Sequence, residues 1–241
     1  MSNSFFSFKQ FTINQDQCAM KVCTDACLFG AWSAKKIKQL VPGTVSVLDI
    51  GTGTGLLSLM AAQSTSAIID AIEIDQDAAK QAAENFLLSP WKHRLRSIHT
   101  SINDFDKSKR YDFIISNPPF YENDLKSTDE VRNAAMHDSE LTFQQLIESI
   151  NQHLTNGGYA TVMLPFQRTV SFEVLAKESG LYIVEKLSVR QSPEHSFFRN
   201  LLLLSRNKPT SEIKGELSIH DNNRNYTPQF INLLKDYYFN L

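Results

Sequence analysis

The sequence predicts an α/β fold built on a mainly parallel sheet, and three observations lead to it. From residue 45 to about 165, short apolar runs alternate with helical stretches, the order that generates βαβ units. Glycine, asparagine or proline follows several of these runs directly, as at strand ends. Beyond residue 166, two apolar runs are joined only by QSPEHS, which permits an antiparallel hairpin but not a parallel crossover.

Seven strands are expected from these runs. The first, VSVLDI, is a continuous apolar segment of the kind that is buried on both faces of a parallel sheet. The last two strands form the antiparallel hairpin. The expected strands span 45–50, 67–74, 95–100, 111–117, 159–165, 181–190 and 197–206.

Helices are expected on both faces of this sheet, and several carry recognisable capping residues. Asp75 stands where it can cap the second helix. Thr142 and Gln145 form a T-x-x-Q capping box. Thr227 and Pro228 have the pattern of an N-cap followed by a first-turn proline. The expected helices span 54–63, 75–88, 143–154 and 167–179, with one more beginning at residue 228.

The composition indicates one ordinary globular domain over residues 1–241. Hydrophobic residues make up 42% and charged residues 21%, and the net charge of −2 gives no overall basic field that would announce a nucleic-acid partner. The N-terminus lacks the apolar core of a signal peptide, and no run approaches the roughly 18 apolar residues of a membrane span. We therefore expect a cytoplasmic chain with a lead over 1–40, a core sheet over 45–206 and an extension over 207–241.

Three cysteines, Cys18, Cys23 and Cys27, lie in one short segment. Their C-x4-C-x3-C spacing matches no common zinc pattern, and no obvious fourth ligand stands nearby. Their odd number also argues against a disulfide framework. We therefore expect free thiols and no metal site.

The stretch LDIGTGTG places Gly51, Gly53 and Gly55 between the first strand and the first helix. Glycine there lets the backbone approach a ligand closely, although a tight turn alone would also use it. The dinucleotide fingerprint requires glycine where Leu56 stands, and no Gly-Lys-Ser/Thr follows. Both phosphate-binding interpretations are therefore disfavoured.

Two acidic residues follow the next two strands. Glu73 ends the second strand 22 residues after Gly51, where a carboxylate can accept both hydroxyls of a ribose. Asp104, in SINDFD after the third strand, could accept from an adenine amino group. A solvated strand end and a structural turn are the respective alternatives. Together the three strand ends describe a site for an adenosine that carries no pyrophosphate.

These stretches resemble the class I S-adenosylmethionine-dependent methyltransferases, whose Rossmann-like fold has seven strands and a C-terminal hairpin. The resemblance implies S-adenosyl-L-methionine as cofactor, with the lead serving as a lid over it. It also implies three groups of cofactor-binding residues. These are Asp49, Gly51, Gly53 and Gly55 at the methionine end, Glu73 at the ribose, and Asn103, Asp104 and Phe105 around the adenine.

The fourth strand runs into Asn117, Pro118, Pro119 and Phe120, which suit methylation of a planar nitrogen. The lone pair of an exocyclic adenine amine is delocalised into the ring, so this nitrogen is a poor nucleophile. The Asn117 side-chain oxygen and the Pro118 carbonyl could accept from the amine hydrogens and stabilise developing positive charge. Phe120 could stack on a base that has been flipped out. The alternative is that the prolines only end the strand and have no role in a site.

This motif resembles that of N6-adenine and glutamine-N5 methyltransferases. The stretches 6–32, 132–147 and 226–238 are similar to bacterial tRNA-Val (adenine-N6)-methyltransferases, although cysteine stands at Cys23 and Cys27 where small residues are expected. The resemblance implies N6-methylation of adenosine 37 in the valine tRNA anticodon loop by a monomer without metal. A glutamine-N5 protein methyltransferase and a non-catalytic cofactor-binding RNA module remain alternatives.

Within the lead, the resemblance places Gln15, Lys21, Thr24 and Asp25 over the cofactor. Lys21 could pair with its carboxylate, and Thr24 or Asp25 with its amine, whereas a solvated surface charge is the alternative for Lys21. Local basic clusters are candidates for phosphate contacts. They comprise 92–96, 107–110, Lys35, Lys36, Lys38, Arg190 and Arg199.

Overall fold

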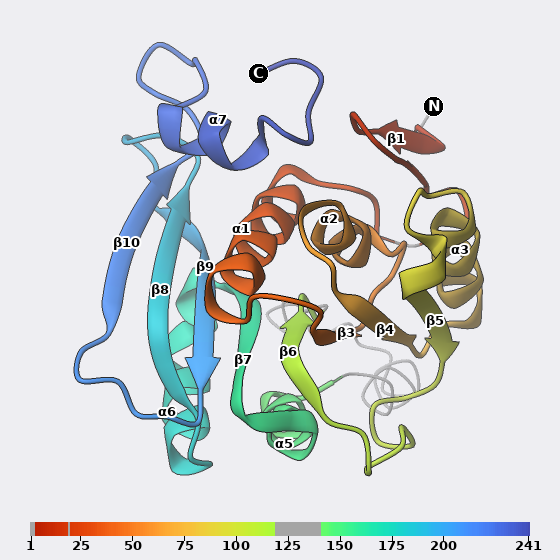
Figure 1. Ribbon diagram of the computed structural model, residues 1–241. Coiled ribbons are helices and arrows are strands. Elements are labelled where there is room, and N and C mark those ends of the chain that lie inside the picture. Colours follow the sequence, from red (N-terminus) through yellow and green to blue (C-terminus); the bar gives the residue numbers. More distant parts are fainter. Residues whose placement is uncertain (1–2, 19, 119–140) are drawn as a thin grey trace, which may run out of the picture.

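The computed structural model describes residues 3–18, 20–118 and 141–241, and an eight-stranded sheet forms its centre (Figure 1). The strands follow the order β10-β8-β9-β7-β6-β3-β4-β5 across the sheet. They are β3 (Ser46–Ile50), β4 (Ile68–Glu73), β5 (Leu95–His99), β6 (Tyr111–Ser116), β7 (Leu154–Pro165), β8 (Tyr182–Arg190), β9 (Phe197–Ser205) and β10 (Ile213–Ser218). Neighbours from β5 to β7 pair in parallel, whereas β9 is antiparallel to both β7 and β8.

The expected mainly parallel sheet with a hairpin is confirmed, but it has more strands than expected. β10 lies at the edge and pairs in parallel with β8. Its sequence, IKGELS, is largely polar and lacks the apolar run that identifies the buried strands. A second unexpected feature lies in the lead, where β1 (Phe5–Ser7) and β2 (Thr12–Asn14) form a separate antiparallel hairpin.

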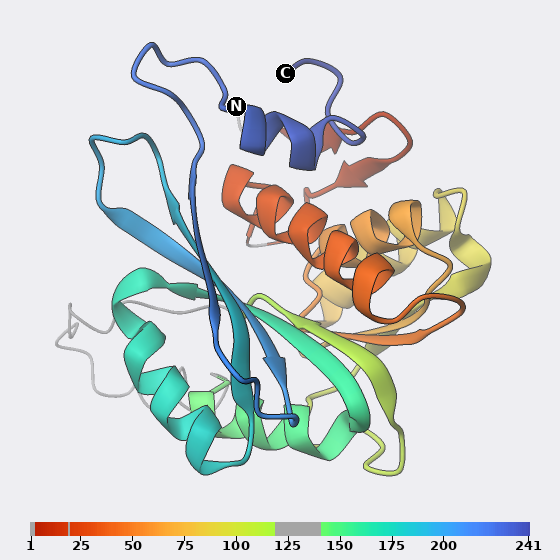
Figure 2. The ribbon, with the colours of Figure 1, turned by 60° about the vertical axis from the view of Figure 1, so that its left-hand side comes forward.

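Helices cover both faces of the sheet (Figure 2). One face carries α1 (Thr24–Leu40), α2 (Leu56–Ser64) and α3 (Gln76–Leu87), with α7 (Pro228–Leu234) against α1. The other face carries α5 (Phe143–His153) and α6 (Thr169–Glu178). Two short 3-10 helices are η1 (Lys92–Arg94) and η2 (Phe166–Arg168). Each face has its own apolar cluster, one including Phe29 and Leu59 and the other Ile150 and Phe172. In the described part of the chain, no helix combines the length and apolarity that crossing a membrane requires.

The expected caps are confirmed. The Asp75 side chain accepts from the Ala78 amide at 2.8 Å. Thr142 and Gln145 form both hydrogen bonds of the capping box. Thr227 accepts from the Phe230 amide at 3.3 Å, with proline in the first turn of α7. Side-chain chemistry therefore sets the start of these three helices, as the sequence predicted.

The lead differs from the expectation in its second half, because residues 24–40 form the 17-residue helix α1. Leu28, Phe29 and Trp32 are buried, and α1 packs against α2 and α7. This half is therefore part of the core. Cys27 lies within it as a buried free thiol, and burial raises its pKa to about 12. Only the first half of the lead is left to cover a site.

Candidate functional site

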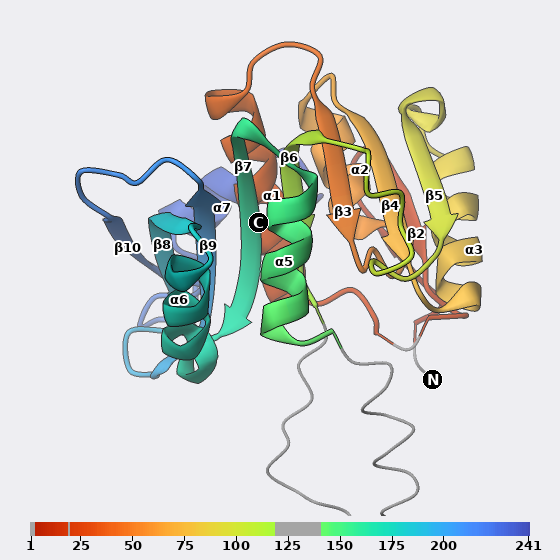
Figure 3. The ribbon, with the colours of Figure 1, turned by 90° about the horizontal axis from the view of Figure 1, so that it is seen from below.

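The carboxyl ends of the central strands meet at one edge of the sheet (Figure 3). Ile50 of β3 is level with Ile72 of β4 and with Ser116 of β6. The next residue on each strand is Gly51, Glu73 and Asn117. The sheet register therefore brings the glycine loop, the ribose candidate and the first catalytic candidate to neighbouring positions, as expected for a parallel α/β sheet.

The glycine loop is closely tied to the end of β4. The Gly51 and Thr52 amides both donate to the Ile72 carbonyl, at 2.9 and 3.1 Å. Gly55 has a φ of 85°, and a Cβ at this position would lie 2.5 Å from the Phe86 ring. Glycine is required there by both backbone conformation and space. The loop is thus held as a compact turn at the N-terminus of α2.

Asp49 lies beneath this loop and is fully buried. Its Oδ2 accepts from the Thr52 and Ser58 hydroxyls, both at 2.7 Å, whereas Oδ1 has no hydrogen-bond partner among the described residues. Burial raises the Asp49 pKa to about 6, against the opposing effect of the two hydroxyls. An unpaired buried carboxylate oxygen is the group that a cationic ligand would satisfy.

Glu73 joins the end of β4 to the glycine loop. Its Oε2 accepts from the Gly53 amide at 2.8 Å, and its Oε1 accepts from the Ile74 and Asp75 amides at 2.9 and 3.0 Å. A carboxylate has about four acceptor positions, so these bonds leave little unused capacity. Ribose hydroxyls would therefore share these oxygens with backbone amides or replace them.

The turn after β5 separates the three adenine candidates. Asp104 is exposed, and its Oδ2 accepts from the Ser101 hydroxyl at 2.7 Å. Asn103 beside it is also exposed. Phe105, in contrast, is buried, and its ring packs near Tyr111 and His153, with centroids 6.4 and 5.3 Å away. These contacts make Phe105 a core residue, unlike the two exposed residues before it.

The first half of the lead reaches the glycine loop through α3. Asn85 accepts from the Asn14 amide at 2.9 Å and donates to the carbonyls of Asn14 and Thr54, each at 2.9 Å. Cys18 Sγ lies 3.8 Å from the point where a Cβ on Gly53 would stand. Gln15 is buried and accepts from the Val22 amide at 2.8 Å. Gln15 therefore shapes the segment that lies against the loop.

The remaining lead candidates have other partners. Asp25 accepts from Arg199 Nε at 2.9 Å and from the Ala26 amide at 3.1 Å. Lys21 Nζ lies 3.3 Å from the Asn3 carbonyl oxygen, to which it donates, and Thr24 is exposed at the start of α1. The Asp25–Arg199 ion pair connects α1 to β9. The expected pairing of Thr24 or Asp25 with the amine of the cofactor stays a prediction.

The end of β6 is fixed against β3. The Ser116 hydroxyl donates to the Ile50 carbonyl at 3.0 Å. Asn117 follows it partly exposed, and Pro118 is buried. Pro119 and Phe120 lie outside the described residues. Sequence reasoning missed Thr52, Ser58, Asn85 and Ser116, although a buried polar position on an amphipathic helix was a signal available for Asn85.

Comparison with known proteins places this geometry in a family. The family model of the methyltransferase small domain matches residues 34–178. The fold is similar to that of a predicted O-methyltransferase from Agrobacterium tumefaciens, with a TM-score of 0.63 and 16% identity over 90% of this chain and 99% of that one.

Two curated relatives match the whole chain. A tRNA1(Val) (adenine(37)-N6)-methyltransferase from Flavobacterium johnsoniae is 41% identical over 98% of this chain and 100% of its own length. A protein of the same name from Cytophaga hutchinsonii is 41% identical over 100% of both chains. These matches show that the chain, with its glycine loop, its acidic strand ends and its Asn117-Pro118 strand exit, is a member of the tRNA1(Val) (adenine(37)-N6)-methyltransferase family.

Proposed function

We propose that this protein transfers the methyl group of S-adenosyl-L-methionine to N6 of adenosine 37 in the anticodon loop of a valine tRNA. The observation that carries the proposal is the 41% identity, over the whole chain, to relatives whose names state this reaction. The position of Asn117 and Pro118 beside the glycine loop supports it, because the reaction needs groups that accept hydrogen bonds from the target amine next to the methyl donor.

The residues at the strand ends fit the cofactor. Asp49, with one buried oxygen unpaired, suits the ammonium of the methionine moiety. Glu73 suits the ribose, and the exposed Asp104 suits the adenine amine. Asn103 and the first half of the lead, from Gln15 to Lys21, would border the same ligand. When bound, S-adenosylmethionine supplies an electrophilic methyl group carried on a sulfonium.

Asn117 and Pro118 would prepare the amine of the target base. The Asn117 side-chain oxygen and the Pro118 carbonyl oxygen can each accept one N6 hydrogen. These two bonds favour the tetrahedral geometry that the nitrogen acquires as its lone pair attacks, and they stabilise the positive charge that develops. The methylated amine then loses a proton to water, so the step needs no strong base. Pro119 and Phe120, by resemblance, complete the pocket for the base.

The target base is chemically accessible. A nucleotide of an anticodon loop is already unpaired, so flipping it into a pocket costs less than extracting a base from a duplex. The protein has a net charge of −2, so we expect few phosphate contacts and a shallow dependence of tRNA affinity on salt. Selectivity would then come from the shape of the loop and from the flanking bases.

The test is methyl transfer with recombinant protein, labelled S-adenosylmethionine and an unmodified valine tRNA transcript. Nucleoside mass spectrometry should find N6-methyladenosine at position 37, and a transcript with guanosine at this position should accept no label. Methylation of a glutamine-containing protein without methylation of tRNA would favour the glutamine-N5 alternative. Tight tRNA and cofactor binding without a single turnover would favour a non-catalytic RNA module.

A further inference from the structure

A row of stacked planar groups lies at the ends of β7, β8 and β9. Phe166 directly follows β7, and Phe197 is the first residue of β9. Their ring centroids are 5.4 Å apart, with 28° between the ring planes. The guanidinium of Arg190, the last residue of β8, lies 5.0 Å from the Phe197 centroid. We call Phe166, Phe197 and Arg190 the aromatic row.

The outer end of this row is open to solvent. Phe166 is 38% exposed, although burial of a phenylalanine side chain is strongly favourable in free energy. Its partner Phe197 is half-buried, and Arg190 is held from the side by one hydrogen bond, from its Nε to the Ser218 hydroxyl, and by an ion pair with Glu216. The row is therefore anchored at one end and presents an aromatic ring at the other.

The row lies at the same sheet edge as Asn117, on the side away from Glu73. β7 runs parallel to β6, with Ser116 level with Val162, so β7 continues three residues beyond the end of β6, to Pro165. Pro165, just before Phe166, is level with Arg199 of β9. Phe166, Phe197 and Arg190 lie at the ends of strands one, two and three places from β6. At about 3.3 Å per residue, Phe166 lies roughly 13 Å beyond the level of Ser116 along the strand direction. In Figure 3 the ends of β3, β4 and β7 point to this edge.

Two further arginine–phenylalanine pairs lie at this end of the sheet. Arg168 of η2 lies over the Phe143 ring at 5.0 Å, and Arg199 lies over the Phe198 ring at 5.6 Å. Arginine interleaved with aromatic rings is typical of surfaces that bind single-stranded nucleic acid, because guanidinium and aromatic planes both stack on bases.

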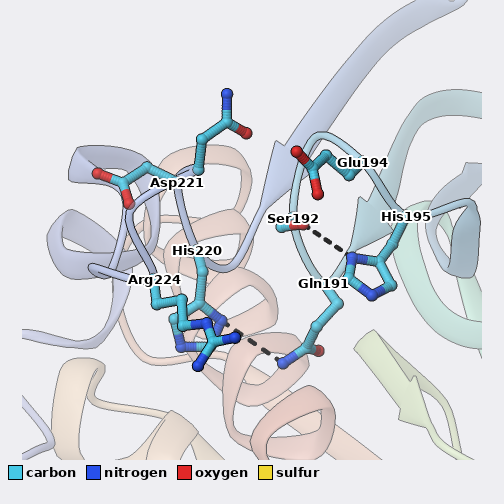
Figure 4. A pocket seen from close by; sticks show the side chains of 8 residues that line it. Gln191, Ser192, Glu194, His195, His220, Asp221 and Arg224 are labelled. Carbon is cyan, nitrogen blue, oxygen red and sulfur yellow. Dashed lines mark hydrogen bonds between the residues drawn. The ribbon is translucent and has the colours of Figure 1, made fainter.

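A polar hollow of about 360 Å³ adjoins the row (Figure 4). One side is the β8–β9 turn, which begins after Arg190 and ends at Phe197, and the other is the loop before α7. In the turn, Ser192 Oγ and His195 Nδ1 are 2.8 Å apart, and Gln191 Nε2 lies 3.5 Å from His220 Nδ1 across the hollow. The hollow beside the aromatic row thus offers these neutral donors and acceptors together with the charged side chains of Glu194, Asp221 and Arg224.

We propose that the aromatic row stacks the base of a nucleotide that flanks the target adenosine in the tRNA loop, with the polar hollow beside it contacting the same RNA segment. This inference rests on the proposed function and names a surface for its substrate. An unpaired loop base exposes both of its faces to water. Stacking one face on Phe166 removes that face and the facing side of the phenylalanine ring from water. Stacking reads no base edge, so this contact would position the loop without selecting a sequence.

The experiment measures steady-state methylation of a valine tRNA transcript by Phe166→Ala and Phe197→Ala. Each substitution should raise the KM for tRNA roughly 5- to 150-fold, the range expected for the loss of one base–aromatic stack. The kcat and the Kd for S-adenosylmethionine should stay within about twofold of wild type. Fluorescence anisotropy with a dye-labelled anticodon stem-loop, measured without turnover, should show the same fold increase in the Kd for RNA. Phe166→Trp should retain affinity, because it keeps the ring.

Phe239→Ala is the matched control, since Phe239 is 62% exposed but lies in the C-terminal tail. It should leave the KM for tRNA unchanged. Phe166→Leu separates stacking from apolar packing: a wild-type KM in this variant overturns the inference, as does an unchanged KM in both alanine variants. A wild-type enzyme that does not methylate valine tRNA at all would instead refute the proposed function, and this inference with it.

Discussion

Asp49 should make the stability of this protein depend on pH in a defined direction. Its folded-state pKa is about 6, above the ordinary value of 3.8, because the carboxyl is buried. The folded state therefore favours the protonated carboxyl. The resulting destabilisation is absent below pH 3.8, develops as the pH rises towards 6, and is complete above it.

The size of this effect follows from the pKa values. At about 1.4 kcal/mol per pKa unit, a rise from 3.8 to about 6 costs ~3 kcal/mol of the free energy of unfolding at neutral pH. Roughly 1 kcal/mol of this cost appears between about pH 5 and pH 7. Asp49→Asn removes the charge and keeps an oxygen for the Thr52 and Ser58 hydroxyls, so the variant should lose this pH dependence.

The assay is urea denaturation of wild type and Asp49→Asn at several pH values between about 5 and 7. Other groups titrate in both proteins, so the informative quantity is the difference between their unfolding free energies. This difference should shift in favour of the variant by about 1 kcal/mol as the pH rises. A difference that is flat with pH would show that Asp49 is already ionised at the lower pH, which would refute the burial argument.

Three further substitutions test other parts of the site. Asn117→Ala should lower the rate of methyl transfer by roughly 100-fold or more in single-turnover assays, while calorimetry finds cofactor affinity nearly unchanged, because the contact forms in the transition state. Glu73→Ala should weaken cofactor binding in calorimetry by roughly 1–3 kcal/mol, since charge-assisted hydrogen bonds are lost. Gly55→Ala should destabilise the fold by about 2–4 kcal/mol in urea denaturation, because the new Cβ meets Phe86 and φ is positive.

Each of these predictions has an outcome that would contradict it. An equal loss of cofactor affinity and rate would make Asn117 a binding residue. Unchanged cofactor affinity in Glu73→Ala would leave that carboxylate only its role in holding the Gly53 amide. Gly43→Ala is the control for Gly55, since Gly43 also has a positive φ but a Cβ there meets no atom within 4 Å. Equal destabilisation by the two substitutions would exclude the clash with Phe86 as a cause.

Local signals in the sequence were sufficient for strands β3 to β9 and for helices α2, α3, α5, α6 and α7. The β-branched run at β3 and the caps at Asp75, Thr142 and Thr227 act over a few residues, so they can be read without a structure. β10 was not predicted because an edge strand can be polar, and because its place in the sheet depends on pairing with β8. The helix α1 was not predicted because its N-cap, Cys23, forms no side-chain capping hydrogen bond and so gives no local start signal.

The candidate site was predictable where sheet register decides it. Gly51, Glu73 and Asn117 come together because parallel strands end at one edge, which the strand order implies. Long-range partners were not predictable. Arg199 reaches Asp25 across 174 positions, and Phe105 is buried by residues on β6 and α5. These contacts depend on the packing of distant elements, for which a single sequence carries no local signal.

The attachment of the lead has a consequence for how a nascent chain matures. The Asn14 amide is bound by Asn85, which is 71 positions later, and Lys9 binds the carbonyls of Tyr237 and Lys235, the latter 226 positions later. At roughly 5–20 residues per second, a ribosome needs on the order of 10–50 s to synthesise that length. The lead can therefore contact the glycine loop soon after residue 85 has been synthesised, but Lys9 finds its partners only after residues 235–237 have followed.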